Sequence, residues 1–262
     1  SKRPAAEVSG SQAAGRPALA ASATSKAAAM PKPVPPAPKL AARWPLVTAG
    51  LLAANALVYL APSEGWFMTA DWRLSLSALA SAYGAGGWTE LVLQSRPFAS
   101  SMFLHADFGH FTHNALGLAL LGTVVERAFG HLRAAALYFG AGLTAGAVWA
   151  AANWGAFMGT MGASGAVMGL AGAFLGYYAL DLHKRPSRSG WQEFWMLPLS
   201  MLAAVVVFQF AGDVWGVAER TSQALGLSAG ELGRTNHLSH LVGLLMGLLS
   251  YRFWARRLRP AA

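Results

Sequence analysis

The chain alternates between long uncharged apolar runs and short segments that carry its charges. The uncharged runs cover residues 44–63, 111–125, 134–180, 194–212 and 235–251. A helix that crosses the bilayer core needs about 20 apolar residues, so the longest run has room for two helices, divided at residues 153–155. The pattern therefore predicts six membrane-spanning helices, at about 44–62, 109–127, 133–152, 164–181, 194–211 and 236–254.

The segments outside these spans differ in composition. Residues 1–43 are rich in Ala, Ser and Pro, a composition that builds no packed core and predicts a flexible tail. Residues 63–108 are too polar to span a membrane but carry many aromatics, which favours short helices lying in the interface. We therefore predict an all-α membrane protein with an interfacial outer loop after the first span, a six-span domain over 44–255 and a basic C-terminal tail over 256–262.

The composition agrees with a membrane protein. Of 262 residues, 55% are hydrophobic and only 12% are charged, about half the charged share of a soluble domain. A net charge of +9 alone favours a nucleic-acid partner, but sixteen of the 20 Lys and Arg residues fall on one set of alternate loops and tails. The positive-inside rule then predicts that both termini are cytoplasmic, and the bilayer rather than nucleic acid is the expected partner.

The identity of the membrane rests on composition alone. The Ala, Gly and Arg content with a plain six-span layout favours a bacterial inner membrane. The alternative is the mitochondrial inner membrane, because a basic, acid-poor tail rich in Ala and Ser is also typical of a transit peptide. The chain has no cysteine, which excludes disulfides and thiol catalysis.

Polar residues at membrane depth are costly and are therefore candidates for function. The first group, at the start of the second span, is His105, His110, His113 and Asn114. A helix places His110 and Asn114 on one face, where their N–H groups can stabilise a developing oxyanion. Two other interpretations stay open: hydrogen bonds that hold helices together, and a metal site of His105, Asp107 and His110.

A serine at the start of the fourth span forms the second group. Ser164 lies between Gly162 and Gly165. A serine at a helix start is most often an N-cap. Glycines on both sides also permit a tight turn that exposes the hydroxyl as a nucleophile.

A histidine in the last span forms the third group. His240 shares a helix face with Gly243 and Gly247, and small residues on that face allow a close approach to the glycine-rich fourth span. One interpretation is that His240 is the general base for Ser164; the other is glycine packing around a buried histidine. In the predicted spans no Asp or Glu lies near the outer ends of the fourth and sixth helices, and Asp181 lies at the opposite end, so the sequence predicts a Ser-His dyad without a third member.

These groups resemble the motifs of the rhomboid intramembrane serine proteases, in the same order and on the corresponding helices. The run His105-Ala-Asp-Phe-Gly-His110-Phe-Thr-His-Asn114 resembles HxxxxHxxxN, Gly162-Ala-Ser164-Gly165 resembles GxSG, and His240-Leu-Val-Gly243 resembles HxxG. Glu126-Arg-Ala-Phe-Gly130 is similar to the family's ExxxG turn, and Arg96 stands at the arginine of its WR pair, with Ser95 in place of the tryptophan. The resemblance covers about residues 44–255 and implies a six-helix bundle.

The resemblance also implies a role for each matched residue. Ser164 would be the nucleophile and His240 its general base, while His110, Asn114 and the Ser164 backbone N–H would form the oxyanion hole. The remaining matched residues would be structural: His105, Glu126, Arg96, Gly162, Gly165, Gly243 and Gly247. His113 matches no motif position and is expected to be a packing residue.

The implied activity is hydrolysis of peptide bonds in or near transmembrane segments of other membrane proteins, with no metal or cofactor. Other intramembrane protease classes lack their residues here, since the sequence has no HExxH motif and no pair of intramembrane aspartates. The main alternative is a non-catalytic rhomboid-like protein that binds membrane clients. A small-solute transporter is a further alternative, but it would need polar residues along a path to both faces.

Overall fold

The computed structural model describes residues 44–61, 74–154, 159–182, 190–224 and 236–258. The predicted tail over residues 1–43 lies outside these ranges, as does most of the predicted C-terminal tail. The comparison with the sequence therefore concerns the helices of the six-span domain and part of the loop after its first helix.

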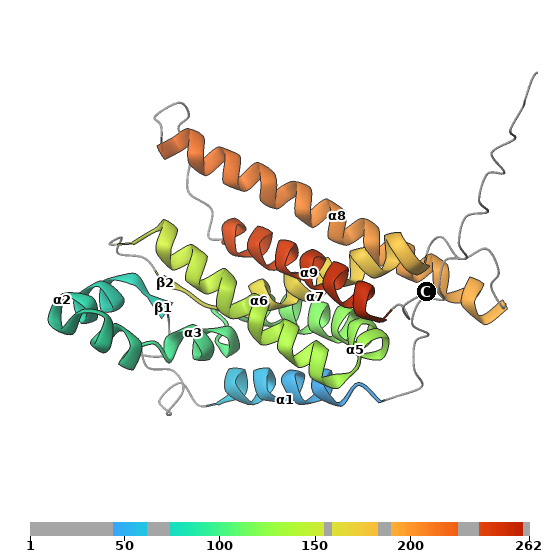
Figure 1. Cartoon of the computed structure of the whole chain (residues 1–262), viewed down its shortest axis with the longest axis horizontal. Helices are drawn as coiled ribbons and strands as arrows, with labels where there is room; N and C mark the ends of the chain where they lie inside the picture. The colour runs from blue at the N-terminus through green and yellow to red at the C-terminus, as the bar shows by residue number, and fades with distance from the viewer. Residues whose placement is uncertain (1–43, 62–73, 155–158, 183–189, 225–235, 259–262) are drawn as a thin grey trace, which may run out of the picture. The chain divides into compact units, whose positions relative to one another are not determined.

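Helical segments occupy the positions of all six predicted spans (Figure 1). They are α1 (Leu46–Leu60); α4 (Phe108–Gly117), continued by the π-helical turn η3 (Leu118–Gly122) and α5 (Thr123–Phe129); α6 (His131–Ala152); α7 (Ser164–Tyr177), continued by η4 (Tyr178–Leu182); α8 (Gly190–Ala224); and α9 (His237–Leu258). Among the described residues, α6 and Leu199–Ala224 of α8 are long and apolar enough to cross a membrane, while Leu46–Leu60 and Ser164–Leu180 are shorter apolar helices. The all-α class is therefore shown for most of the described chain, and the count of six spans stays a prediction.

Helix α8 is longer than the sequence pattern predicts. The predicted fifth span ends at residue 211 because Asp213 closes the uncharged run, whereas α8 continues to Ala224. A single charge ends a hydropathy run without ending a helix, provided that the charge finds partners. The stretch from 212 to 224 is therefore helix rather than loop, and α9 similarly continues to Leu258, past the predicted domain boundary at 255.

The described part of the loop after the first helix is also mainly helical. It contains α2 (Leu76–Leu93), which is kinked at Gly86 and Gly87, then α3 (Pro97–Ser100) and the 3-10 turn η2 (Ser101–Phe103). Short helices were expected here, but a strand pair was not. The strand β1 (Leu74–Ser75) pairs antiparallel with β2 (Gly159–Thr160), which joins this loop to the segment before α7.

Helix α7 is the centre of the packing. Every residue from Gly165 to Phe174 is buried, and α7 packs against α6 and α9, which lie side by side, with α8 against α9 (Figure 1). The residues of α7 are mostly small, so neighbouring backbones approach it closely.

A buried carboxylate joins α1 to the end of α5. Glu126 is 2% exposed and accepts hydrogen bonds from the backbone N–H groups of Val47 (2.8 Å) and Thr48 (2.7 Å) and from the Thr48 hydroxyl (2.7 Å). His131 contacts the same carboxylate through Nδ1. Glu126 thus satisfies free N–H groups in the first turn of α1, where the helix dipole also favours a negative charge.

The outer surface of α8 is apolar. Met201, Val205 and Phe208 are 63%, 63% and 82% exposed, and further large apolar side chains of α8 are exposed at Val207, Phe210, Val214 and Trp215. An apolar surface of this extent is unfavourable in water and favourable in lipid.

Candidate functional site

Ser164 is the first residue of α7, and two contacts hold the loop that precedes it. Thr160 pairs with Leu74 in the β1–β2 ladder, and the Gly162 N–H donates to the Ser101 carbonyl at 2.8 Å. Gly162 has φ +118°, a conformation that other residues rarely adopt. The loop that leads into Ser164 is therefore held at Thr160 and at Gly162, two residues before the serine.

Glycines bring α9 against the start of α7. A Cβ at Gly243 would collide with the Gly165 carbonyl oxygen, and one at Gly247 would collide with the Gly169 carbonyl oxygen. A Cβ at Gly165 would in turn lie 3.7 Å from the Ser239 carbonyl oxygen of α9. Gly243 and Gly247 therefore have the steric role that their spacing predicts, because any side chain there would force α9 away from α7. At Gly165 the close contact is with α6 instead, where a Cβ would lie 2.9 Å from the Ala145 Cβ.

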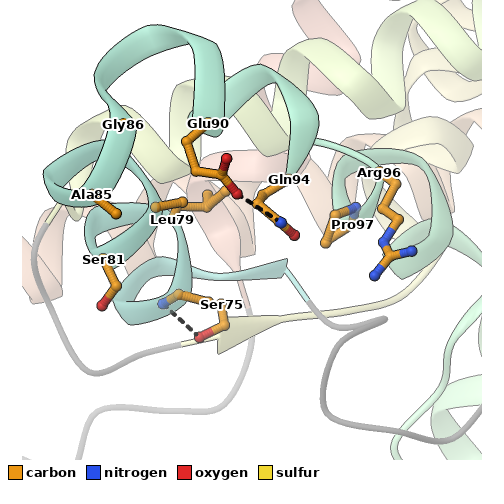
Figure 2. Close-up of a pocket in the computed structure, with 11 residues that line it drawn as sticks. Ser75, Leu79, Ser81, Ala85, Gly86, Glu90, Gln94, Arg96 and Pro97 are labelled. Carbon is orange, nitrogen blue, oxygen red and sulfur yellow. Dashed lines mark hydrogen bonds between the residues drawn. The ribbon is translucent and has the colours of Figure 1, made fainter.

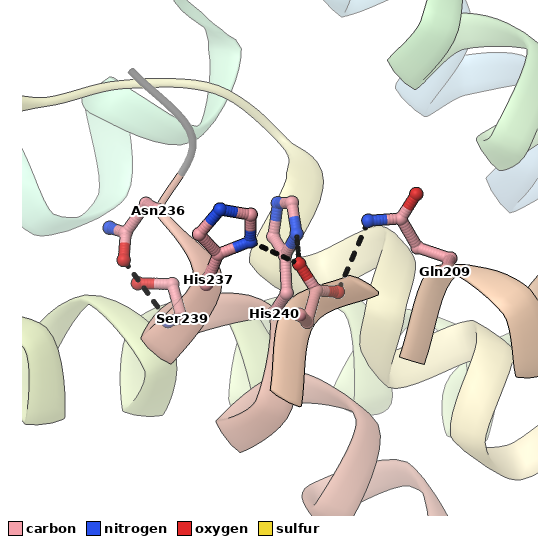
Figure 3. A network of polar contacts seen from close by, with 6 residues as sticks. Gln209, Asn236, His237, Ser239 and His240 are labelled. Carbon is pink, nitrogen blue, oxygen red and sulfur yellow. Dashed lines mark hydrogen bonds and ion pairs between the residues drawn. The ribbon is translucent and has the colours of Figure 1, made fainter. Parts of the chain in front are cut away.

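The imidazole of His240 is held by an acid of α8 (Figure 3). Its Nδ1 lies 2.9 Å from Oδ1 of Asp213, and Nδ1 of His237 lies 2.7 Å from the same oxygen. The prediction that no acid is available to the histidine was therefore wrong. It failed because the predicted fifth span ends at residue 211, before Asp213, whereas the extra turns of α8 carry this residue to α9.

Ser164 and His240 lie on helices in contact, but they are not hydrogen-bonded in this conformation: within the described ranges Ser164 Oγ has no hydrogen-bond partner. Ser164 lines a hollow of about 30 Å³ together with Gly162, Asn236 and Ser239, a volume sufficient for a water molecule. Hydrogen bonds between catalytic groups are often long or poorly aligned before substrate binds. The missing hydrogen bond is therefore compatible with Ser164 as a nucleophile and His240 as its base.

The two predicted oxyanion donors lie in α4. His110 Nδ1 accepts a hydrogen bond from the Ala106 N–H at 3.4 Å, so its proton is on Nε2, and a Cβ at Gly162 would lie only 2.6 Å from that Nε2. Asn114 is buried and its amide donates to the His110 carbonyl at 2.9 Å, which leaves one amide hydrogen for another acceptor. His110 therefore directs an N–H group toward the serine loop.

His105 lies beneath His110 as a buried aromatic ring. It is 6% exposed, contacts the rings of His110 and Phe111, and neither ring nitrogen has a hydrogen-bond partner among the described residues. Burial, and secondarily the charge of His110, lower the pKa of His105 to about 4. His113, which was expected to be a packing residue, is exposed.

Arg96 lies apart from this site. It precedes α3 and lines a hollow of about 540 Å³ between α2 and α3, together with Ser75, Glu90 and Gln94 (Figure 2). Glu90 and Gln94 are hydrogen-bonded to each other at 2.9 Å. None of the residues that line this hollow is a predicted catalytic residue, so it is separate from the site around Ser164.

The metal site considered from the sequence, at His105, Asp107 and His110, is not the cluster that the structure brings together. Asp107 instead caps α4, since its Oδ1 accepts from the His110 N–H at 2.8 Å. Among the residues that the structure describes, the ligand atoms that converge, within 4.8 Å of one another, belong to Asp213, His237 and His240, a donor set that zinc accepts. Hydrogen bonds between these same atoms already account for the cluster.

Sequence reasoning missed Asp213, Asn236 and His237. Asn236 caps α9 by accepting from the Ser239 N–H at 3.1 Å and also donates to the Thr160 hydroxyl at 3.0 Å, so it ties the start of α9 to the serine loop. Asn followed three residues later by Ser at the start of an apolar run could have indicated the cap. Asp213 could have been interpreted as an acid within the membrane instead of as a residue beyond the end of the fifth span.

Comparison with known protein families identifies one family for this chain. No curated protein matches the chain. The family model described as "Rhomboid domain" matches residues 92–257, a segment that includes His105, His110, Ser164 and His240. The chain therefore belongs to the rhomboid family.

Proposed function

We propose that this protein is an intramembrane serine protease that hydrolyses peptide bonds in or near transmembrane segments of other membrane proteins. The rhomboid family is generally proteolytic and also has non-catalytic members. The observation that carries the proposal is that α4 and α9 both meet the start of α7. His110 Nε2 of α4 lies beside Gly162 in the turn before Ser164, and α9, which carries His240, packs closely on Gly165. Both Ser164 and His240, the residues that catalysis requires, are present.

The proposed reaction follows from these groups. Ser164 Oγ attacks the scissile carbonyl while His240 Nε2 takes the hydroxyl proton. The tetrahedral oxyanion is stabilised by the His110 Nε2–H, the Asn114 amide and the Ser164 backbone N–H, which is free at the first position of α7. His240 then gives its proton to the leaving amine, and water hydrolyses the acyl-enzyme on Ser164. The proposed chemistry uses no metal or cofactor.

The proposed substrates are transmembrane segments that unwind locally. A helix holds its carbonyls in intrahelical hydrogen bonds, so a scissile carbonyl must leave the helix before Ser164 can attack it. Small or helix-breaking residues near the scissile bond are therefore expected.

The rhomboid domain and the apolar helices make this an integral membrane protein. We propose six spans and cytoplasmic termini from the distribution of basic residues. The proposed membrane is a bacterial inner membrane, with the mitochondrial inner membrane as the alternative.

Cleavage of a generic transmembrane substrate by the purified protein in liposomes tests the proposal. We expect wild-type protein to cleave, and Ser164→Ala and His240→Ala to lose on the order of 10⁴-fold or more of kcat. The matched control is Ser100→Ala, a serine-to-alanine change in α3, outside the proposed catalytic group. Equal cleavage by wild-type and Ser164→Ala protein would contradict the proposal and favour a non-catalytic, client-binding protein.

A further inference from the structure

Asp213 is a fully buried carboxylate of α8. It is 0% exposed and is contacted by three polar groups: Oδ1 by Nδ1 of His237 (2.7 Å) and of His240 (2.9 Å), and Oδ2 by the Gln209 amide nitrogen (3.2 Å). Burial of a carboxylate is costly unless hydrogen bonds replace its hydration. The three contacts supply that replacement, and two of them come from α9.

The contact with Asp213 determines which nitrogen of His240 carries the proton. An ionised carboxylate only accepts hydrogen bonds, so Nδ1 must be the protonated nitrogen of neutral His240. The lone pair is then on Nε2, the nitrogen that remains for Ser164. A general base that takes the serine proton needs this tautomer.

The same contact stabilises the charge that forms during catalysis. When Nε2 takes the proton from Ser164 Oγ, His240 becomes an imidazolium whose Nδ1–H still donates to Asp213. The carboxylate keeps its negative charge throughout and compensates the positive ring at 2.9 Å. In a site with few water molecules, such compensation is stronger than at an exposed surface.

We propose that Asp213 is the third member of the catalytic group in this protein, a positioning residue that fixes the tautomer and orientation of His240. The inference rests on the proposed protease function. It replaces the predicted dyad with a Ser164–His240–Asp213 arrangement in which the acid comes from α8.

A structural role for Asp213 makes a different prediction. His237 contacts the same oxygen, so Asp213 would serve only to hold α8 against the first turn of α9. In that case its replacement would lower stability and leave the kcat of the folded protein nearly unchanged.

Asp213→Asn and Asp213→Leu separate the two roles. Asn keeps the size of the side chain without its charge, and Leu keeps its branched shape without any polar atom. We expect the kcat for a transmembrane substrate to fall by on the order of 10²-fold or more in both, with KM within about twofold because Asp213 does not line the hollow at Ser164. The rate at which a fluorophosphonate labels Ser164 should fall in parallel with kcat.

Glu219→Gln is the matched control, since it is the same carboxylate-to-amide change at an exposed position of the same helix. It should leave kcat, KM and the labelling rate unchanged. A kcat within threefold of wild type in folded Asp213→Asn and Asp213→Leu protein would overturn the role of Asp213 while leaving the protease intact. A wild-type protein that neither cleaves nor is labelled would overturn both.

A measurement on the unmutated chain tests the inference even if neither variant folds. In ¹⁵N-histidine NMR of the full chain in detergent, with the His240 resonance assigned by its loss in His240→Ala, neutral His240 should be protonated on Nδ1 and unprotonated on Nε2. The opposite tautomer would overturn the inference.

Discussion

The turn before Ser164 depends on one residue without a side chain. Gly162 has φ +118°, and a Cβ there would lie 2.6 Å from His110 Nε2. A methyl group must therefore displace either the turn or the imidazole that is proposed to donate to the oxyanion.

We therefore predict that Gly162→Ala lowers kcat by about 10²–10³-fold, the usual cost of losing an oxyanion donor, while the protein stays folded. Steady-state cleavage kinetics together with thermal unfolding check this. Gly84→Ala is the control, because nothing lies within 4 Å of a Cβ at Gly84. Unchanged kcat in Gly162→Ala would contradict the proposed position of His110.

The pKa of His105 predicts a pH dependence of stability. The pKa of the His105 side chain is about 4 in the folded protein, below the value of about 6.5 expected after unfolding. Between these values the unfolded chain binds the proton more strongly, so stability should fall as pH falls from about 6.5 toward 4. At most on the order of 3 kcal/mol is involved, less to the extent that the ring is hydrated.

Thermal unfolding in detergent across this pH range, wild type beside His105→Phe, isolates this contribution. Phe keeps the ring packing and does not titrate, so its Tm should fall less steeply between pH 6.5 and pH 4.5. Identical slopes for both proteins would show that His105 is not buried in its neutral form.

At the residue scale, the sequence could predict the groups whose chemistry is local. Ser164, His110 and His240 stand out because a polar side chain in an apolar run is costly, and the structure places their three helices around one loop. Asp213 and Asn236 could not be assigned in the same way. Their roles depend on where α8 ends and on which segment faces the start of α9, and neither follows from spacing along the chain.

At the scale of elements, the close packing of α7 and α9 determines whether Ser164 and His240 meet. A Cβ at Gly243 would collide with the Gly165 carbonyl oxygen and lie 3.3 Å from the Gly169 N. Backbone atoms of a buried helix do not yield as a flexible side chain does. The two helices would have to separate.

Gly243→Ala should therefore lower Tm by roughly 5–10 °C, from overpacking of about 1–3 kcal/mol. Gly140→Ala, within α6, is the control: nothing lies within 4 Å of its Cβ, and the higher helix propensity of alanine should leave it neutral or slightly stabilised. Thermal unfolding of both variants in the same detergent measures the difference. Equal Tm values would contradict the glycine contact.

The helix positions were predictable from apolar runs, whereas helix ends were less so. The predicted end of the fifth helix is too early, because α8 also includes residues 212–224. Hydropathy reports the cost of a charge in lipid and does not report whether the backbone hydrogen bonds of a helix continue. The β1–β2 ladder was missed for another reason. Two-residue strands from segments about 85 residues apart have no periodicity for a sequence pattern to display.

At the scale of the whole molecule, the protein must expose apolar side chains to lipid and also hold polar groups for the proposed reaction. The exposed apolar side chains of α8 suit lipid, while the reaction proposed at Ser164 would need water and a carbonyl released from a helix. A site at the meeting point of α4, α7 and α9 satisfies both needs if its polar groups face one another instead of lipid. His110 Nε2 faces the turn at Gly162 and His240 Nδ1 faces Asp213, so both imidazoles face polar groups or backbone of the protein.

The central claim is that Ser164 is a nucleophile activated by His240. The most direct measurement is labelling of the purified protein with a fluorophosphonate, followed by mass spectrometry of the modified peptide. The account predicts one adduct, on Ser164, that is absent in Ser164→Ala and strongly slowed in His240→Ala protein with unchanged Tm. A folded wild-type protein without an adduct at Ser164, or with equal labelling in His240→Ala, would contradict it.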